Sequence, residues 1–170
     1  MTTENVAEAV SAPSTHEEEP EIEEEREFSK NPTVLYALVQ KKLWKEVIAR
    51  TQTHPDEARV FIVRKGKDGS MRWRLLPIHA AIVFKAPEDA IDALLTAYPE
   101  AAQKKDDQQM LPLHLAFRNG ASAEIVNSLL LAFPDSVEYP DRKGRKPYTL
   151  ANNAEAPLRD QYIYALAKGP

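Results

Sequence analysis

Two histidines occupy matching places in this chain, and histidine is the side chain best suited to metal binding or proton transfer near neutral pH. His79 and His114 lie 35 residues apart, each two residues after a proline. Such a pair of imidazoles could supply two metal ligands, but zinc sites use three or four protein ligands. No further histidine and no cysteine recurs in the same register. The sequence therefore predicts no metal site and no cofactor.

The residue patterns typical of enzymes are also missing from the sequence. The chain has no cysteine and only five glycines, and it contains neither a Gly-x-Ser-x-Gly motif nor a glycine-rich phosphate loop. We therefore predict that the protein is not an enzyme. The lack of cysteine suits a cytoplasmic or nuclear protein. No apolar run reaches the roughly 18 residues of a membrane span, and the first residues lack the pattern of a secretion signal.

Basic side chains gather in three polar stretches, at residues 64–74, 104–105 and 142–146. Clustered cations attract acidic partners and speed their encounter. Arginine and tryptophan are also common in the hot spots of protein interfaces. We predict a binding site for another, acidic protein, made of Arg64, Lys67, Arg72, Trp73, Arg74, Lys104, Lys105, Arg118, Arg142 and Arg145.

A nucleic acid or another polyanion is the alternative partner for these cations. Residues 31–170 carry 20 basic and 16 acidic side chains, a net charge of +4, which is small for a polyanion-binding domain. Residues 1–30 carry ten glutamates against Arg26 and Lys30, a net charge of −8, and would repel a polyanion. We therefore favour a protein partner and consider nucleic acid unlikely.

A 35-residue repeat organises the chain around these residues. The stretch Leu-Pro-Ile-His-Ala-Ala at 76–81 recurs as Leu-Pro-Leu-His-Leu-Ala at 111–116. The proline and the last alanine keep the register a third time, at Pro147 and Ala151. A fixed period of this size is typical of stacked-repeat proteins, whose units bury their apolar faces against one another.

Each repeat is expected to hold two helices. Proline suits the first position of a helix, so short helices are predicted at 77–84 and 112–118. A longer helix opens with Pro87 as its first residue, and the apolar residues of 91–98 follow the i, i+3, i+4, i+7 spacing of one helix face. A capping helix is predicted at 157–167.

Two stretches depart from this helical pattern. Residues 59–75 place β-branched and aromatic side chains on both sides of an Asp-Gly turn signal, which predicts a β-hairpin and the only strands of the chain. Residues 1–30 have few large apolar side chains and many like charges, so we predict a disordered acidic tail. Its glutamate run, Glu17–Glu27, is able to contact the basic residues of the same chain.

The repeat resembles the ankyrin repeat over roughly residues 33–167. Pro77, Pro112 and Pro147 match the proline of that family's Thr-Pro-Leu-His-x-Ala signature, and His79 and His114 match its histidine. The paired leucines of the second helices and an Asp-x-x-Gly turn between units match as well. The chain departs from the family in its period, 35 in place of the usual 33, and in the residue before each proline. Pentatricopeptide RNA-binding repeats share the period of 35, but they leave no room for a polar finger loop of ten residues.

The resemblance implies a mostly α fold, an ankyrin-like helical repeat solenoid with projecting β-hairpin and finger loops. The repeat domain would span residues 31–170, with units at about 33–76, 77–111, 112–146 and 147–167. In that family the histidine is structural, and the fold serves as a non-catalytic module for protein–protein interaction. An intracellular adaptor that binds its partner through the finger loops and the concave face is the function that the resemblance implies.

Overall fold

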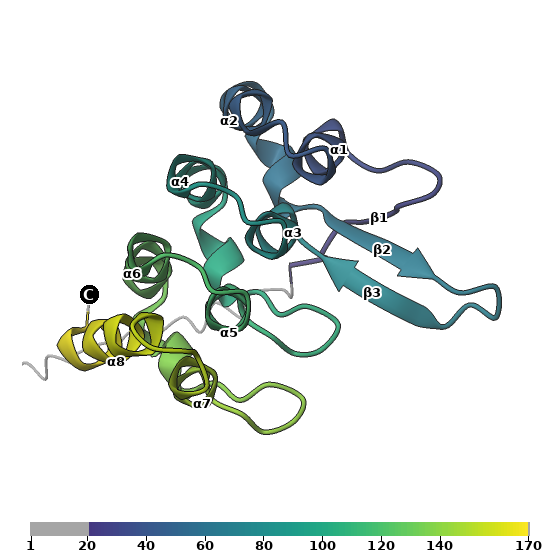
Figure 1. Cartoon of the computed structure of the whole chain (residues 1–170). Coiled ribbons are helices and arrows are strands. Elements are labelled where there is room, and N and C mark those ends of the chain that lie inside the picture. Colours follow the sequence, from purple (N-terminus) through teal and green to yellow (C-terminus); the bar gives the residue numbers. More distant parts are fainter. Residues whose placement is uncertain (1–20, 170) are drawn as a thin grey trace, which may run out of the picture.

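The computed structural model describes residues 21–169 as mostly helical, with one small sheet of three strands. Figure 1 shows the helices in two rows, α1, α3, α5 and α7 in one and α2, α4, α6 and α8 in the other. The β-hairpin (residues 61–75) and two long loops (residues 104–111 and 139–146) project in the same direction, beyond the row of α1, α3, α5 and α7 (Figure 1). The helices are α1 (Val34–Gln40), α2 (Trp44–Thr53), α3 (Pro77–Val83), α4 (Glu88–Ala97), α5 (Pro112–Arg118), α6 (Ala123–Ala132), α7 (Pro147–Asn152) and α8 (Leu158–Lys168).

The predicted hairpin is confirmed, as strands β2 (Phe61–Lys65) and β3 (Met71–Leu75). Its turn uses Gly69 at a φ of +79°, a conformation that glycine adopts without a steric penalty. The Gly66 N–H donates to the carbonyl of Ser70, which closes the turn.

A third strand corrects the prediction that the hairpin holds the only strands and that all of residues 1–30 are disordered. Strand β1 (Glu25–Glu27) pairs in parallel with β2, in the register Glu25 to Phe61. The disorder prediction relied on repulsion among glutamates, but basic side chains of the body neutralise several of these carboxylates. Residues 1–20, including Glu17–Glu19, lie outside the described residues.

The first helix of each pair begins where the sequence indicated. Pro77, Pro112 and Pro147 are the first residues of α3, α5 and α7. After α5 the chain turns through Gly120 at a φ of +69°, and after α3 it turns through Lys85 at +62°. The prediction that Pro87 is the first helical residue of α4 is wrong by one position, because its ψ of 162° is extended and places it at the N-cap.

Three short 3₁₀ helices follow α2, α4 and α6, in stretches where the sequence predicted no helix. They are η1 (Pro55–Arg59), η2 (Pro99–Gln103) and η3 (Pro134–Glu138), and each begins with a proline. Each also buries a small side chain against the helices, such as Ala58, Ala101 or Ser136. A single turn is too short to show a hydrophobic period, so the pattern did not indicate it.

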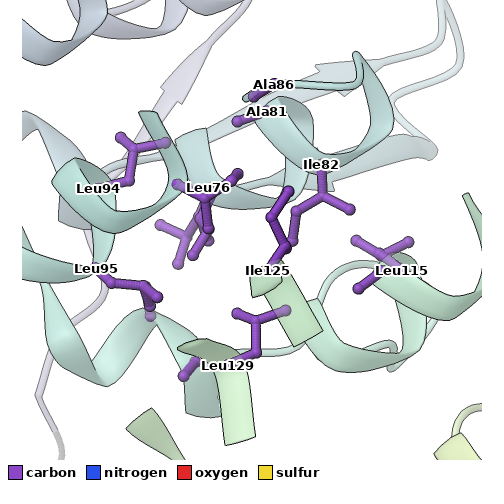
Figure 2. Close-up of a cluster of buried hydrophobic side chains, with 14 of the residues drawn as sticks. Leu76, Ala81, Ile82, Ala86, Leu94, Leu95, Leu115, Ile125 and Leu129 are labelled. Atoms are coloured by element: carbon purple, nitrogen blue, oxygen red, sulfur yellow. The ribbon is translucent and has the colours of Figure 1, made fainter. Parts of the chain in front are cut away.

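The core lies between the two rows of helices. Figure 2 shows Leu94 and Leu95 of α4 gathered with Leu76, and Ile125 and Leu129 of α6 in the same cluster. The small alanines that recur in the first helices are fully buried, which lets neighbouring pairs approach closely. None of the helices in the described part of the chain is long and apolar enough to cross a membrane.

Candidate functional site

Asp107 joins the hairpin and the two long loops into one rigid edge. Its Oδ1 accepts a hydrogen bond from the backbone N–H of Arg74 on β3, at 3.0 Å. Its backbone carbonyl accepts from Arg142 of the following loop, at 2.5 Å. The Arg142 N–H also donates to the carbonyl of Gln108, at 3.1 Å. Three segments far apart in sequence are therefore fixed in relation to one another before any ligand arrives.

Buried aspartates shape these loops from within. Oδ1 of Asp106 accepts the N–H groups of Gln108 and Met110, both at 2.8 Å. Oδ1 of Asp141 accepts those of Lys143 and Arg145, both at 2.9 Å, one repeat later. Burial raises the pKa of Asp106. Burial also acts to raise the pKa of Asp141, but hydrogen bonds from Arg145 outweigh it and leave that pKa below its ordinary value.

His79 and His114 tie the start of a first helix to the loop that follows its unit. Nδ1 of His79 accepts the N–H of Leu76 at 3.0 Å, which places the ring proton on Nε2. This Nε2 then donates to the carbonyl of Lys104 at 2.9 Å. His114 makes the corresponding bonds to Leu111 and Arg145, both at 3.1 Å. Both nitrogens of each ring are engaged, so neither has a lone pair free for a metal ion.

An aromatic cluster covers the inner face of the hairpin. The Trp73 ring lies 5.3 Å from Phe28, edge to face, and 6.1 Å from Tyr36 of α1, nearly parallel. The Arg64 guanidinium lies 5.9 Å from the centroid of the Phe28 ring. Tyr36 is buried, and this burial raises its pKa to about 12. The cluster provides apolar area beside a cation, the combination that is common at binding hot spots.

A groove of about 430 Å³ opens between this cluster and the first row of helices. Its apolar side includes Phe28, Tyr36 and Trp73, together with Phe84 at the end of α3. The groove is also lined by the following charged or polar side chains: Arg64, Arg72, Arg118, Gln40, Gln108, Asp106 and Asp107. This pocket brings these arginines and aromatic rings together.

The structure brings together four of the ten predicted binding residues around this groove, Arg64, Arg72, Trp73 and Arg118. The three arginines are exposed. Within the described part of the chain, none of the three forms an ion pair with a carboxylate. Within residues 21–169, Arg118 donates to the sulfur of Met110, at 3.3 Å, and to no other acceptor. These charges therefore remain available to a ligand in the groove.

Three of the predicted residues already have acidic partners within the chain. Arg74 pairs with Glu23 at 2.5 Å and with Glu25 at 2.6 Å, and its side chain is only 19% exposed. Lys104 pairs with Glu23 at 3.2 Å. Arg145 pairs with the buried Asp141 at 2.8 Å. Their contribution to an external partner is reduced accordingly.

The other three predicted residues lie apart from the groove. Lys67 is exposed in the hairpin turn. Lys105 lies 5.4 Å from the centroid of the Tyr139 ring. The Arg142 guanidinium donates to the carbonyl of Asp107, a residue that lines both the groove and a second pocket between the loops. Nine of the ten residues, all but Lys67, line three pockets that share Asp107: the groove, a second pocket with Arg74, Lys104, Lys105 and Arg142, and a third with Arg72, Arg142 and Arg145.

The predicted site did not include the aromatic residues Phe28 and Tyr36 of the groove. Phe28 stands directly after the glutamate run, and Tyr36 lies in the first helix of the domain. The signal for Phe28 was a bulky aromatic residue at the end of a charged run. Disordered segments contain few aromatic residues, so this residue indicated a contact with the folded domain.

No cluster of three or more histidine, cysteine or acidic side chains within residues 21–169 could hold a metal ion. Neither a scan of protein-family models nor a search of curated proteins matches this chain.

Proposed function

We propose that this chain is a non-catalytic protein-binding module with an ankyrin-like stack of helix pairs. The repeat in the sequence, the two rows of helices in Figure 1 and the matching bonds of His79 and His114 support this assignment of the fold. On this proposal, the hairpin and long loops are the finger loops of the stack. The module acts as an intracellular adaptor.

The groove between the hairpin and the first helices is the proposed binding surface. The observation that carries the proposal is a set of exposed arginines beside an aromatic wall, none of which forms an ion pair within residues 21–169. A partner segment with an apolar side chain and nearby carboxylates would bury the first against Trp73 and pair the second with Arg72 and Arg118. Strand β3, which carries Arg72 and Trp73, is held by the hydrogen bond from Arg74 to Asp107, and this lowers the entropy lost on binding.

Site-specific photo-cross-linking in the full chain tests this proposal. A photoreactive amino acid replaces Gln108 in the groove or, as a control, the exposed Gln52 on α2. We expect one protein from the native cell lysate to cross-link through position 108 and not through position 52.

A charge reversal identifies the source of the affinity. Arg72→Glu with Arg118→Glu should abolish the cross-link, whereas Lys45→Glu with Arg159→Glu, an equal change of charge on α2 and α8, should preserve it. Equal cross-linking by both double variants would contradict the proposed groove. If labelled DNA or RNA binds instead, with an affinity that falls steeply as salt rises, the surface serves a polyanion.

A further inference from the structure

The glutamates that precede and form β1 alternate along the chain and contact one set of cations. Glu21 lies 3.7 Å from Arg59 and 3.8 Å from Lys104. Glu23 lies 3.2 Å from Lys104 and 2.5 Å from Arg74, and Glu25 lies 2.6 Å from Arg74. Extended chain places every second side chain on the same side. The spacing of these carboxylates is therefore that of an extended peptide lying across three cations.

The cations are held in place by the folded body and not only by the glutamates. The Arg74 guanidinium stacks over the Phe61 ring, 3.4 Å from its centroid. The Arg59 guanidinium lies 5.3 Å from the centroid of the Tyr98 ring. Such contacts fix a cation through the face of an aromatic ring. Arg59 and Arg74 are thus preorganised for an acidic strand, and Lys104 contacts the same glutamates beside them.

Backbone bonds along β2 complete this surface. The N–H of Phe61 donates to the carbonyl of Glu24, and the N–H of Phe28 donates to the carbonyl of Val63, both at 2.9 Å. An edge that pairs with an added extended peptide is a common mode of peptide recognition, in which main-chain bonds give affinity and alternate side chains give specificity.

The segment 21–28 is bound as a peptide ligand would be and contributes little to the core. The three carboxylates remain between 35% and 56% exposed. Ile22, its one aliphatic side chain, is 94% exposed. Only Phe28 packs against the core, between Trp73 and Arg64. Charge and a short run of backbone bonds hold the rest.

We propose that the edge of β2 and the cations Arg59, Arg74 and Lys104 form a receptor for acidic peptide strands, which the chain's own segment 21–28 occupies. The external ligand is a protein segment with carboxylates at alternate positions followed by an aromatic residue. The aromatic residue replaces Phe28 beside Trp73. Because Arg74 and Trp73 are successive strand residues, they point to opposite faces of the sheet. The cation side of this receptor is therefore separate from the groove proposed above, and the two sites meet only at the aromatic residue beside Trp73.

A labelled peptide with the sequence of residues 20–29, Pro-Glu-Ile-Glu-Glu-Glu-Arg-Glu-Phe-Ser, is the probe. It is titrated by fluorescence anisotropy against the full chain and against the full chain carrying Glu21→Lys, Glu23→Lys and Glu25→Lys. An internal segment that fills the site reduces the apparent affinity by the fraction of open molecules. We therefore expect the triple variant to bind the peptide at least about tenfold more tightly than the native chain.

Matched controls separate this receptor from the groove. Adding Arg74→Glu to the triple variant should remove binding, whereas adding Arg72→Glu and Arg118→Glu should leave it unchanged. A peptide with glutamine at its three alternate glutamates should bind about tenfold more weakly or not at all. If no protein cross-links through position 108 but the triple variant binds the peptide, the proposed function alone is overturned. If position 108 cross-links to a protein but the triple variant does not bind the peptide, the receptor alone is overturned.

Two results would overturn the receptor. One is a triple variant that keeps its circular dichroism spectrum but binds the peptide no better than the native chain. The other is a triple variant that unfolds, because the segment would then be part of the fold. Hydrogen exchange on the native chain tests independently whether segment 21–28 leaves the edge of β2. The amides of Phe28 and Phe61, which bond this segment to β2, should exchange faster than the amides that bond β2 to β3. Equal exchange rates would contradict displacement of the segment.

Discussion

Two buried imidazoles, chiefly that of His79, make the stability of this protein sensitive to mild acid. His79 is fully buried and neutral, with both ring nitrogens bonded to backbone groups. Burial lowers its pKa to about 4, whereas an unfolded chain has a histidine pKa of about 6.5. Below about pH 6.5 the unfolded state binds a proton that the folded state excludes, so the free energy of unfolding falls as pH falls towards 4. Burial lowers the pKa of His114 as well, which adds in the same direction.

Between about pH 7.5 and pH 5.5, His79 alone should reduce the free energy of unfolding by about 1 kcal/mol. Urea denaturation at the two pH values measures this change. His79→Gln should flatten the pH dependence, since glutamine does not titrate in this range, whereas His54→Gln, at an exposed position, should keep it. An unchanged slope in the His79→Gln chain would show that another group is responsible.

Within residues 21–169, one buried hydroxyl has no hydrogen-bond partner and should weaken the fold. Ser136 in η3 is 1% exposed, and its Oγ has no hydrogen-bond partner among the described residues. The matching position one repeat earlier is Ala101, which is buried without polar cost. Ser136→Ala should therefore raise the free energy of unfolding by about 1 kcal/mol in urea denaturation.

The same chemical change at Ser122 is the control for Ser136→Ala. The Oγ of Ser122 accepts the N–H of Ile125 at the start of α6, at 3.3 Å. Removing an N-cap of this kind costs about 1 kcal/mol. Ser122→Ala should thus have the opposite sign, and a loss of stability in both variants would mean that the Ser136 hydroxyl is bonded after all.

At the scale of elements, the sequence predicted what periodicity and turn chemistry can encode. The helices predicted at 77–84, 112–118 and 157–167 are found at 77–83, 112–118 and 158–168. Strand β1 was missed because its polar residues have no apolar alternation; it is stabilised by cations from distant segments. The groove was only partly predicted for the same reason: Arg72 and Trp73 stand out locally, but Phe28 and Tyr36 join them only through folding.

A buried carboxylate, Glu57, connects η1 with α1 and α2, and the residues next to it in the sequence give no sign of this contact. Glu57 in η1 accepts the Leu35 N–H near the start of α1 at 2.8 Å, and it accepts Arg50 of α2 at 2.6 Å. Its side chain is only 12% exposed. Burial acts to raise the pKa of Glu57, but bonds from Arg50 and Leu35 outweigh it, so the carboxylate stays charged at neutral pH.

Loss of this carboxylate should loosen three elements together. Glu57→Ala leaves a helix N–H and Arg50 without their partner, so we expect a loss of about 2 kcal/mol in the free energy of unfolding. Glu57→Gln keeps one acceptor and should lose about 1 kcal/mol. Thermal or urea denaturation measures both, with the exposed Glu46→Gln as the neutral control. A Glu57→Ala chain as stable as the control would contradict the tie between the elements.

At the scale of the whole molecule, stability should vary along the rows of helices. Helices α7 and α8 lie at one end of the rows in Figure 1, and each contacts the preceding helix of its row, α5 or α6. Tyr162 is the main anchor of α8: it is fully buried, its ring lies 4.8 Å from Phe117, and its hydroxyl donates to the carbonyl of Ala121. In stacked repeats each unit is stabilised mainly by its neighbours, so an end unit can open alone.

Tyr162→Ala should therefore unfold residues 147–168 and leave the rest of the chain folded. Removing a buried aromatic side chain costs about 3–5 kcal/mol, which exceeds the stability expected of two short helices at one end. Hydrogen exchange read by mass spectrometry should show rapid exchange in α7 and α8 and native protection in α3 and α4. Tyr164→Ala, which removes a ring that is 68% exposed, should change neither. A uniform loss of protection in the Tyr162→Ala chain would mean instead that the helix pairs unfold as a single cooperative unit.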